Sequence, residues 1–293
     1  MVSRDRPAVP RVLPAAGCAG TGRELARFGD LTELDAVLVG PIGTGAHPMD
    51  CRAVELRATP GGLVHGRAPE EPVGQVVAEH LPWLRARGVR VLCAVRGTTS
   101  GETGGIVTRL RGSLDFDCVL GVEVDLTAPG VPGRSTGTED GTVPTHSADP
   151  QACLKLMSRV REVLPRGLLL TAKIGMECPD QVAAARSAIA GGAMAIVLSG
   201  AVPAHPPGSL LTGPAVTAVT LGAVHRLRAA MAQGRVPEVP VVACGGVHDR
   251  ESIRAVLAAG ASAVQVGTAV LADPGVLWRL HRDSVGATEE MSR

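Results

Sequence analysis

The sequence predicts an α/β fold, a (β/α)8 TIM barrel with long loops on its C-terminal face, formed by residues 1–293 as a single domain. Strand-like and helix-like patterns alternate almost throughout the chain. Eight segments are nearly continuous apolar runs, as expected of parallel strands covered on both faces. The length of 293 residues suits one barrel with insertions, because such folds run to about 250 residues.

The expected strands occupy residues 12–15, 36–39, 89–95, 119–124, 168–174, 195–198, 239–243 and 263–266. The expected helices occupy residues 21–28, 73–87, 150–164, 179–190, 214–233, 249–259 and 274–283. Several of them begin with proline, or with Asp249 as a cap, as helices commonly do. This number of alternating units favours a closed barrel over an open doubly wound sheet.

Three connections are long and lack clear periodicity: 40–72, 127–149 and 199–213. Each follows an expected strand, so all three should emerge at the C-terminal face, where barrel enzymes carry their active sites. Long loops in compact domains tend to be lids, binding loops or disordered segments. We therefore expect them to surround a site.

Composition narrows the function classes. A net charge of +1 gives no electrostatic argument for binding nucleic acid or a membrane surface, and an aromatic content of 1% argues against sugar-binding or base-stacking surfaces. The 7 cysteines are scattered without a C-x-x-C pair and read as reduced thiols. The start of the chain lacks a signal-peptide core, and no apolar run could span a bilayer. We expect a cytoplasmic protein with a small-molecule substrate.

Residues 236–274 are the most informative stretch. Two strand-like runs end in glycine signals, Cys244-Gly245-Gly246 and Gly267-Thr268, and a short helix pattern lies between them. Glycine lets the backbone approach a ligand closely, and a helix that starts there points free N–H groups at the same place. Two such signals in consecutive βα units are typical of the phosphate site after strands seven and eight of a barrel. The alternative is a pair of ordinary tight turns.

Charged residues occur in two expected strands. Lys173 lies near the end of an otherwise apolar strand, which is costly unless its ammonium reaches a partner or the barrel mouth. Solvent beyond the strand is the alternative destination. Glu123 and Asp125 share one face of the preceding strand and are placed to meet Lys173. Such a contact suits a structural ion pair as well as a catalytic one.

Together these motifs resemble dihydroorotate dehydrogenase, a family of flavoproteins that carry flavin mononucleotide (FMN) on a (β/α)8 barrel. The residues that carry the resemblance are Ala16-Gly17, 123–133, Lys173, 211–215, 244–247 and 263–269. It is strongest over 211–280, persists in outline through 119–175, and is loose before residue 70.

The resemblance implies a set of cofactor-binding residues. Those that would hold the phosphate and ribityl end of FMN through backbone N–H groups are Gly213, Gly245, Gly246, Gly267 and Thr268. Ala16 and Gly17, in a turn of small residues after the first strand, would underlie the isoalloxazine. Lys173 would lie against the polar edge of that ring, and Ser199 is counted with the same cofactor-binding set.

The chain departs from the family where the substrate should bind. The family's catalytic base, a cysteine or serine, is Ala128 here, and the two asparagines of the same motif are aspartate and glycine. The family's lysine after strand two aligns with Gly40, the asparagine motif expected near 65–71 reads His-Gly-Arg-Ala-Pro-Glu-Glu, and the pair at 199–200 is altered. Because a site built to hydrogen-bond one substrate rejects analogues strongly, these losses together predict a different substrate.

A replacement base could come from His65, His146, His205 or the pair Glu177-Cys178. Histidine suits proton transfer near neutral pH, although a solvated loop position is the plainer interpretation of each one. We favour His65 because it aligns with a family substrate position. Thr127, Lys173 and His65 are the candidate catalytic residues. No spacing among the histidines indicates a metal site.

The leading hypothesis is an FMN-dependent oxidoreductase of the CH–CH donor class that transfers hydride between flavin N5 and a small substrate other than dihydroorotate, in specialised metabolism. One alternative is a flavin-independent lyase, isomerase or synthase acting on a phosphorylated metabolite. Others are a true dihydroorotate dehydrogenase and a non-catalytic flavin- or partner-binding barrel. A homodimer is a candidate assembly, although no apolar stripe identifies its interface.

Overall fold

The computed structural model describes residues 7–45, 56–128, 145–206 and 208–291. Its main sheet has nine strands, all parallel, in the order β1-β13-β12-β9-β8-β7-β6-β2-β5. Eight of these strands fall where the apolar runs predict them: β1 (Val12–Pro14), β2 (Val37–Gly43), β6 (Val91–Val95), β7 (Val119–Asp125), β8 (Leu169–Ile174), β9 (Ala195–Ser199), β12 (Val241–Cys244) and β13 (Ala263–Val266). The ninth, β5 (Glu71–Pro72), is a short addition beside β2.

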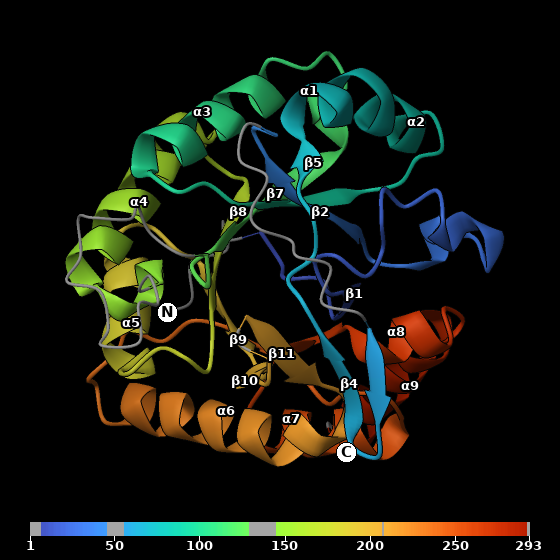
Figure 1. The fold of residues 1–293 in the computed structure, drawn as a ribbon, viewed down its shortest axis with the longest axis vertical. Helices are drawn as coiled ribbons and strands as arrows, with labels where there is room; N and C mark the ends of the chain where they lie inside the picture. The colour runs from blue at the N-terminus through green and yellow to red at the C-terminus, as the bar shows by residue number, and fades with distance from the viewer. Residues whose placement is uncertain (1–6, 46–55, 129–144, 207, 292–293) are drawn as a thin grey trace.

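The sheet curls until its first strand returns to β2 (Figure 1). The N–H of Gly17, just after β1, donates to the carbonyl oxygen of Gly40 in β2 over 2.7 Å. Gly40 has a φ of 115°, and a Cβ there would lie 2.5 Å from the carbonyl oxygen of Ala94. Only glycine can therefore occupy this contact between the strands. The arrangement is consistent with a TIM-like barrel.

Helices surround the sheet on its outer face (Figure 1). The longer ones are α3 (Ser100–Arg111), α4 (Pro150–Val163), α5 (Gln181–Ala190), α6 (Thr217–Ala232), α7 (Arg250–Ala258) and α9 (Val276–Met291). Residues 73–85 form one helical stretch, in which a π-helical segment (Val76–His80) joins α1 (Val73–Gln75) to α2 (Leu81–Arg85). Asp249 caps α7 as expected, since its side chain accepts from the Ser252 N–H over 2.8 Å.

Three helix assignments differ from the expectation. The helix expected over 21–28 is wrong: Gly22 has a φ of 90°, which interrupts a helix, and only the 3-10 turn Leu25–Arg27 forms there. Helix α3 was not expected because its three glycines weaken the apolar periodicity, although the Thr99 hydroxyl caps it by accepting from the Glu102 N–H. The five-residue α8 (Thr268–Ala272) was also not expected.

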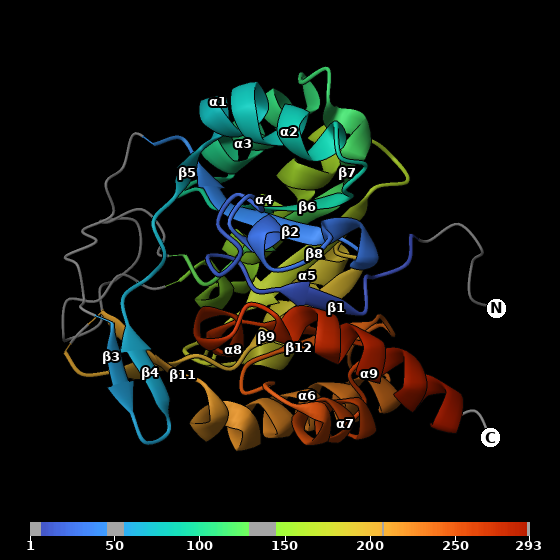
Figure 2. The same cartoon turned by 90° about the vertical axis from the view of Figure 1, so that its right-hand side faces the viewer.

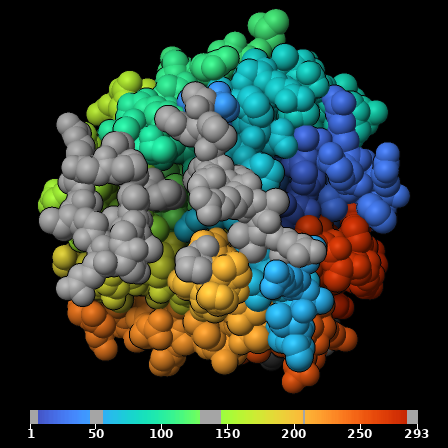
Figure 3. Space-filling view, viewed as in Figure 1, coloured from blue at the N-terminus to red at the C-terminus, as the bar shows by residue number. Residues whose placement is uncertain are grey.

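A second sheet lies beyond the C-terminal ends of the barrel strands (Figure 2). It is antiparallel, in the order β10-β11-β4-β3, and joins β3 (Arg57–Thr59) and β4 (Gly62–His65) to β10 (Val202–Ala204) and β11 (Ser209–Thr212). Two connections expected to be loops, 40–72 and 199–213, thus carry strands that pair with each other; the space-filling view shows them side by side (Figure 3). Residues 129–144 of the third connection lie outside the described residues.

The interior of the barrel is mostly apolar but contains four buried polar or charged side chains. Valine, leucine, isoleucine and alanine form the main core, while Glu123, Thr171, Lys173 and Gln265 are buried on the strands. Burying such side chains is costly unless they are hydrogen-bonded. All four lie on β7, β8 and β13, so these polar groups of the interior are confined to three strands. Among the described helices, none is both long enough and apolar enough to cross a membrane.

Candidate active site

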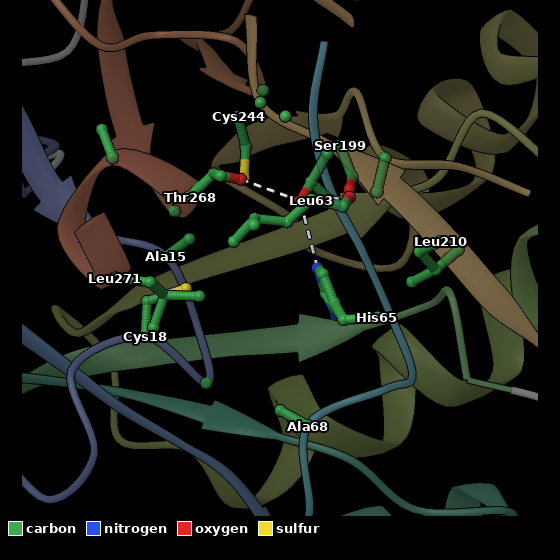
Figure 4. A pocket seen from close by; sticks show the side chains of 18 of the residues that line it. Ala15, Cys18, Leu63, His65, Ala68, Ser199, Leu210, Cys244, Thr268 and Leu271 are labelled. Atoms are coloured by element: carbon green, nitrogen blue, oxygen red, sulfur yellow. Dashed lines mark hydrogen bonds between the residues drawn. The ribbon is translucent and has the colours of Figure 1, made fainter. Parts of the chain in front are cut away.

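A cavity of about 970 Å³ opens at the C-terminal ends of the parallel strands, under the antiparallel sheet (Figure 4). The favoured catalytic candidates and all the predicted cofactor-binding residues line it: Ala16, Gly17, His65, Thr127, Lys173, Ser199, Gly213, Gly245, Gly246, Gly267 and Thr268. The fold therefore brings together residues from both ends of the chain, from Ala16 to Thr268. Their individual roles remain predictions.

One end of the cavity is formed by glycine turns. Gly213, Gly245 and Gly246 have φ values of 108°, 148° and 76°, which disfavour any side chain. A Cβ on Gly246 would overlap the Thr217 hydroxyl and lie 2.6 Å from the Thr217 Cα. Thr268 follows β13 at the same end, and its hydroxyl donates to that of Thr212 over 2.8 Å. The glycines let these turns pack closely against neighbouring backbone, so this end of the cavity is formed by main chain that carries no side chain.

Lys173 lies on β8 with a fixed set of partners. Its Nζ donates to Gln265 Oε1 over 3.1 Å and lies 3.6 Å from Glu123 Oε1, and the Gln265 amide also donates to Glu123. Burial alone would lower the pKa of Lys173, but Cys244, Glu123 and Asp125 outweigh burial and hold that pKa above its ordinary value. Lys173 is therefore a cation at the cavity wall, and its predicted contact with Glu123 is confirmed.

Asp125 has a different partner from the one expected. Arg96, directly after β6, donates from Nε to Asp125 Oδ2 over 2.9 Å, and both side chains are 8% exposed. Burial alone would raise the pKa of Asp125, but Arg96 and Arg67 hold it well below its usual range. Asp125 thus stays anionic within a buried pair. Arg96 and Arg67 were not identified from the sequence; the only signal for Arg96 was its place at a strand end.

Thr127 is poorly suited to act as a base. Its hydroxyl donates to Asp125 Oδ1 over 2.6 Å and accepts from Arg67 Nη1 over 2.9 Å. Its proton is committed to an anion of low pKa, and a cationic donor reduces the basicity of its oxygen. We interpret Thr127 as a link between Arg67 and Asp125.

His65 presents one nitrogen toward the cavity. Its Nδ1 lies 2.6 Å from the carbonyl oxygen of Gly66, which requires an N–H there, so Nε2 is the acceptor for the Thr212 hydroxyl 3.1 Å away (Figure 4). The other proposed bases, His146, His205, Glu177 and Cys178, do not line the cavity. His146 is buried with Nε2 against the Gly97 carbonyl, and the Cys178 thiol donates to the Ser147 carbonyl.

Two departures from the family pattern have structural consequences. Gly40 cannot be replaced by lysine in this backbone, because a Cβ would meet the Ala94 carbonyl at 2.5 Å and the Ile42 nitrogen at 2.8 Å. Ala128, at the position of the family's base, is 2% exposed and does not line the cavity. Neither position supplies a group that could bind or deprotonate a substrate.

The chain is similar in sequence to known proteins over most of its length. A family model described as nitronate monooxygenase matches residues 176–274. The catalytic subunit of dihydroorotate dehydrogenase B (NAD(+)) from Geobacillus kaustophilus is 28% identical over 272 residues, which cover 90% of this chain and 82% of that protein. The corresponding subunit from Anoxybacillus flavithermus is 27% identical over 275 residues (90% and 83%), and that from Listeria innocua is 26% identical over 282 residues (92% and 86%).

The curled parallel sheet and the cavity at its strand ends are those of a TIM-like barrel. Within that class the chain is similar to the catalytic subunit of dihydroorotate dehydrogenase B (NAD(+)), and the similarity extends over 90% of its length.

Proposed function

We propose that this chain is an FMN-dependent oxidoreductase on a single (β/α)8 barrel domain. The observation that carries the proposal is the combination, in one cavity, of a side-chain-free cradle of glycine backbone with a buried cation, Lys173. The cradle suits an anionic phosphate group, which backbone N–H groups can surround. The cation suits a ring that gains negative charge when it is reduced.

The proposed cofactor contacts follow from these positions. The residues that would hold the phosphate and ribityl end are Gly213, Gly245, Gly246, Gly267 and Thr268, and the cradle fits because its four glycines present backbone without a side chain to the cavity. Ala16 and Gly17 would lie beneath the ring, with Ser199 and Lys173 at its edges. When bound, FMN supplies a hydride acceptor or donor at N5.

The chain's own residues would divide the remaining tasks. Glu123 and Gln265 hold the Lys173 ammonium in one place, so its charge needs no reorganisation during the reaction. His65 is the proposed proton-transfer residue, because its Nδ1–H is fixed on the Gly66 carbonyl while Nε2 can take a proton. The Thr212 hydroxyl that donates to Nε2 has a second acceptor, the Leu63 carbonyl at 3.4 Å, to which it can turn when Nε2 is protonated.

The proposed substrate is a small molecule other than dihydroorotate. Ala128 lacks a titratable group, and the backbone at Gly40 excludes a lysine, so two of the groups that the family resemblance implies for substrate have no counterpart. True dihydroorotate dehydrogenase activity is the second candidate, supported by the relatives named above. Anaerobic mixing with dihydroorotate distinguishes the two, since bleaching of the flavin absorbance would favour the second candidate.

The cofactor is tested with a matched pair of glycine variants. Gly246→Ala and Gly234→Ala place alanine at similar φ values, 76° and 69°, but a Cβ on Gly234 meets nothing within 4 Å. Both pay the backbone cost of a left-handed alanine, about 1–2 kcal/mol. A Cβ on Gly246 also overlaps Thr217 and must shift this turn of the cavity, so only Gly246→Ala should lower FMN affinity, by about tenfold or more, which corresponds to about 1.4 kcal/mol of binding free energy. Flavin absorbance and FMN released on denaturation measure it; a wild-type protein that is colourless and binds no added FMN would refute the proposal.

A further inference from the structure

Arg67 is an arginine on the cavity wall, in the segment 66–70 between β4 and β5. Its side chain is 22% exposed, so the guanidinium reaches the cavity and is partly shielded from bulk water. An arginine carries five N–H donors. Within the described residues one hydrogen bond uses them, from Nη1 to Thr127 Oγ1 over 2.9 Å. The guanidinium therefore retains donors for a ligand.

Among the described residues, no carboxylate accepts a hydrogen bond directly from Arg67. The other charged side chains that line the cavity are each close to a counterion: Arg96 with Asp125, Lys173 with Glu123, and Arg279 with Asp273. Two acidic groups lie near Arg67. Asp125 is bound directly by Arg96 and reaches Arg67 through the Thr127 hydroxyl, and Glu177 Oε1 lies 3.9 Å from Nη2, which exceeds hydrogen-bond distance. Burial raises the pKa of Glu177, and its Oε1 has no hydrogen-bond partner among the described residues. Glu177 is thus a weak competitor for the guanidinium.

The backbone on both sides of Arg67 is held in place. Arg96 donates from Nη1 to the Ala68 carbonyl over 3.0 Å, and the His65 ring donates to the Gly66 carbonyl. Ala68 also packs against Gly17, where an added Cβ would overlap the Ala68 Cβ. Arg67 consequently faces the end of β7 before any ligand arrives. A donor that is already positioned loses less conformational entropy on binding.

We propose that Arg67 selects the substrate by binding a carboxylate group in the cavity. A planar guanidinium presents parallel N–H groups that match the two oxygens of a carboxylate, which a lysine or an amide does not. Arg67 also lies within 65–71, where the family resemblance leads us to expect a neutral asparagine motif, so a charged donor stands in a segment where uncharged donors are expected. That the bound carboxylate is the substrate of an oxidoreductase rests on the proposed function. The binding of a carboxylate by Arg67 does not.

The test measures binding of carboxylates and their amides to the purified full-length protein. Acetate, propanoate and benzoate are each paired with the corresponding amide at constant ionic strength. Binding is followed by calorimetry and, where flavin is present, by perturbation of its absorbance. The wild-type protein should bind at least one carboxylate more tightly than its amide. Arg67→Met should weaken that carboxylate about 10- to 100-fold, as expected for a hydrogen bond to a charged group, and leave the amide within a few-fold.

Two further variants make the result specific. Arg67→Lys keeps the charge but loses the planar fork and should fall between the wild type and Arg67→Met. Arg279→Met removes an arginine of the same cavity that is paired with Asp273, and it should leave carboxylate binding unchanged. Thermal melts confirm that each variant is folded.

Each outcome bears on one proposal. Carboxylates that fail to bind at millimolar concentration, that bind no better than amides, or that bind Arg67→Met as tightly as the wild type would overturn the role of Arg67. Failure to bind FMN refutes the oxidoreductase proposal instead. Calorimetry of carboxylates on the flavin-free protein would still measure the contribution of Arg67.

Discussion

Replacing Arg96 with methionine tests the buried charge arrangement at the cavity. Methionine keeps the length of the side chain and removes its charge. Asp125 would then remain as a buried carboxylate whose other hydrogen-bond partners are the Thr127 N–H and hydroxyl, at 3.0 and 2.6 Å. The Ala68 carbonyl would also lose its donor.

Removing one partner of a buried ion pair typically costs about 3–5 kcal/mol, because the remaining charge is left without compensation. Arg67 also acts on Asp125 and would remain, since it is one of the groups that lower the Asp125 pKa. We therefore expect a loss of about 3 kcal/mol in the free energy of unfolding at pH 7, the lower end of that range.

The loss should depend on pH with a defined sign. In the wild type the folded-state pKa of Asp125 is depressed, so the stability that it contributes is present above the unfolded value, about 3.9, and disappears as the pH falls through the folded value. In Arg96→Met the folded-state pKa should rise instead. The deficit relative to the wild type should then be largest near neutral pH and should shrink as the pH falls toward about 4, where Asp125 takes up a proton in the variant.

Urea denaturation at several pH values measures the effect, with linear extrapolation and flavin content kept equal between the samples. The double variant Arg96→Met/Asp125→Asn, together with Asp125→Asn, completes a cycle that isolates the interaction between the two side chains. A loss below about 1 kcal/mol at pH 7, typical of an exposed pair, would refute our account of this pair as a buried one. So would a deficit that grows as the pH falls.

Two predictions concern the chemistry of the cavity. Lys173→Met should make the bound flavin harder to reduce and lower its reduction potential by roughly 30 mV or more, which corresponds to about 1.4 kcal/mol for two electrons. Equilibration with redox dyes measures the potential. An unchanged potential would contradict the proposed position of the Lys173 ammonium at the edge of the flavin ring. His65→Gln should slow flavin reduction by the cognate substrate about 10²- to 10⁴-fold, while the flavin spectrum and FMN content stay the same. Stopped-flow absorbance measures the rate of reduction. A wild-type rate in the variant would exclude His65 as the proton-transfer residue.

The strands of the barrel were predictable because of where they lie. A parallel strand buried on both faces needs an apolar side chain at nearly every position, so β6 and β9 are visible as continuous apolar runs. Strands β4 and β11 were not visible, because they are four residues long and only partly buried. Each becomes a strand through pairing with the other, 147 residues away between Val64 and Leu211, and no local pattern encodes a partner at that distance.

Helices were predictable where periodicity and caps were both present. Helix α7 combines an apolar stripe with the Asp249 capping box and was located to within a residue or two. Glycine accounts for both larger errors, since Gly22 interrupts the helix expected after β1 and the glycines of α3 hide a helix that does form. In α3 a glycine permits close packing: a Cβ on Gly104 would lie 2.9 Å from the Arg159 side chain.

The sequence by itself determined the parts of the site that depend on the backbone. Gly245 and Gly246 adopt left-handed conformations that other residues avoid, so their identity already indicated a turn open to a ligand. Tertiary structure decided which charges meet. Arg96 and Asp125 are 29 residues apart, and Gln265 and Glu123 are 142 apart. A conformational requirement belongs to one residue and is written in its type, whereas an ion pair belongs to two residues and exists only once the fold has placed them together.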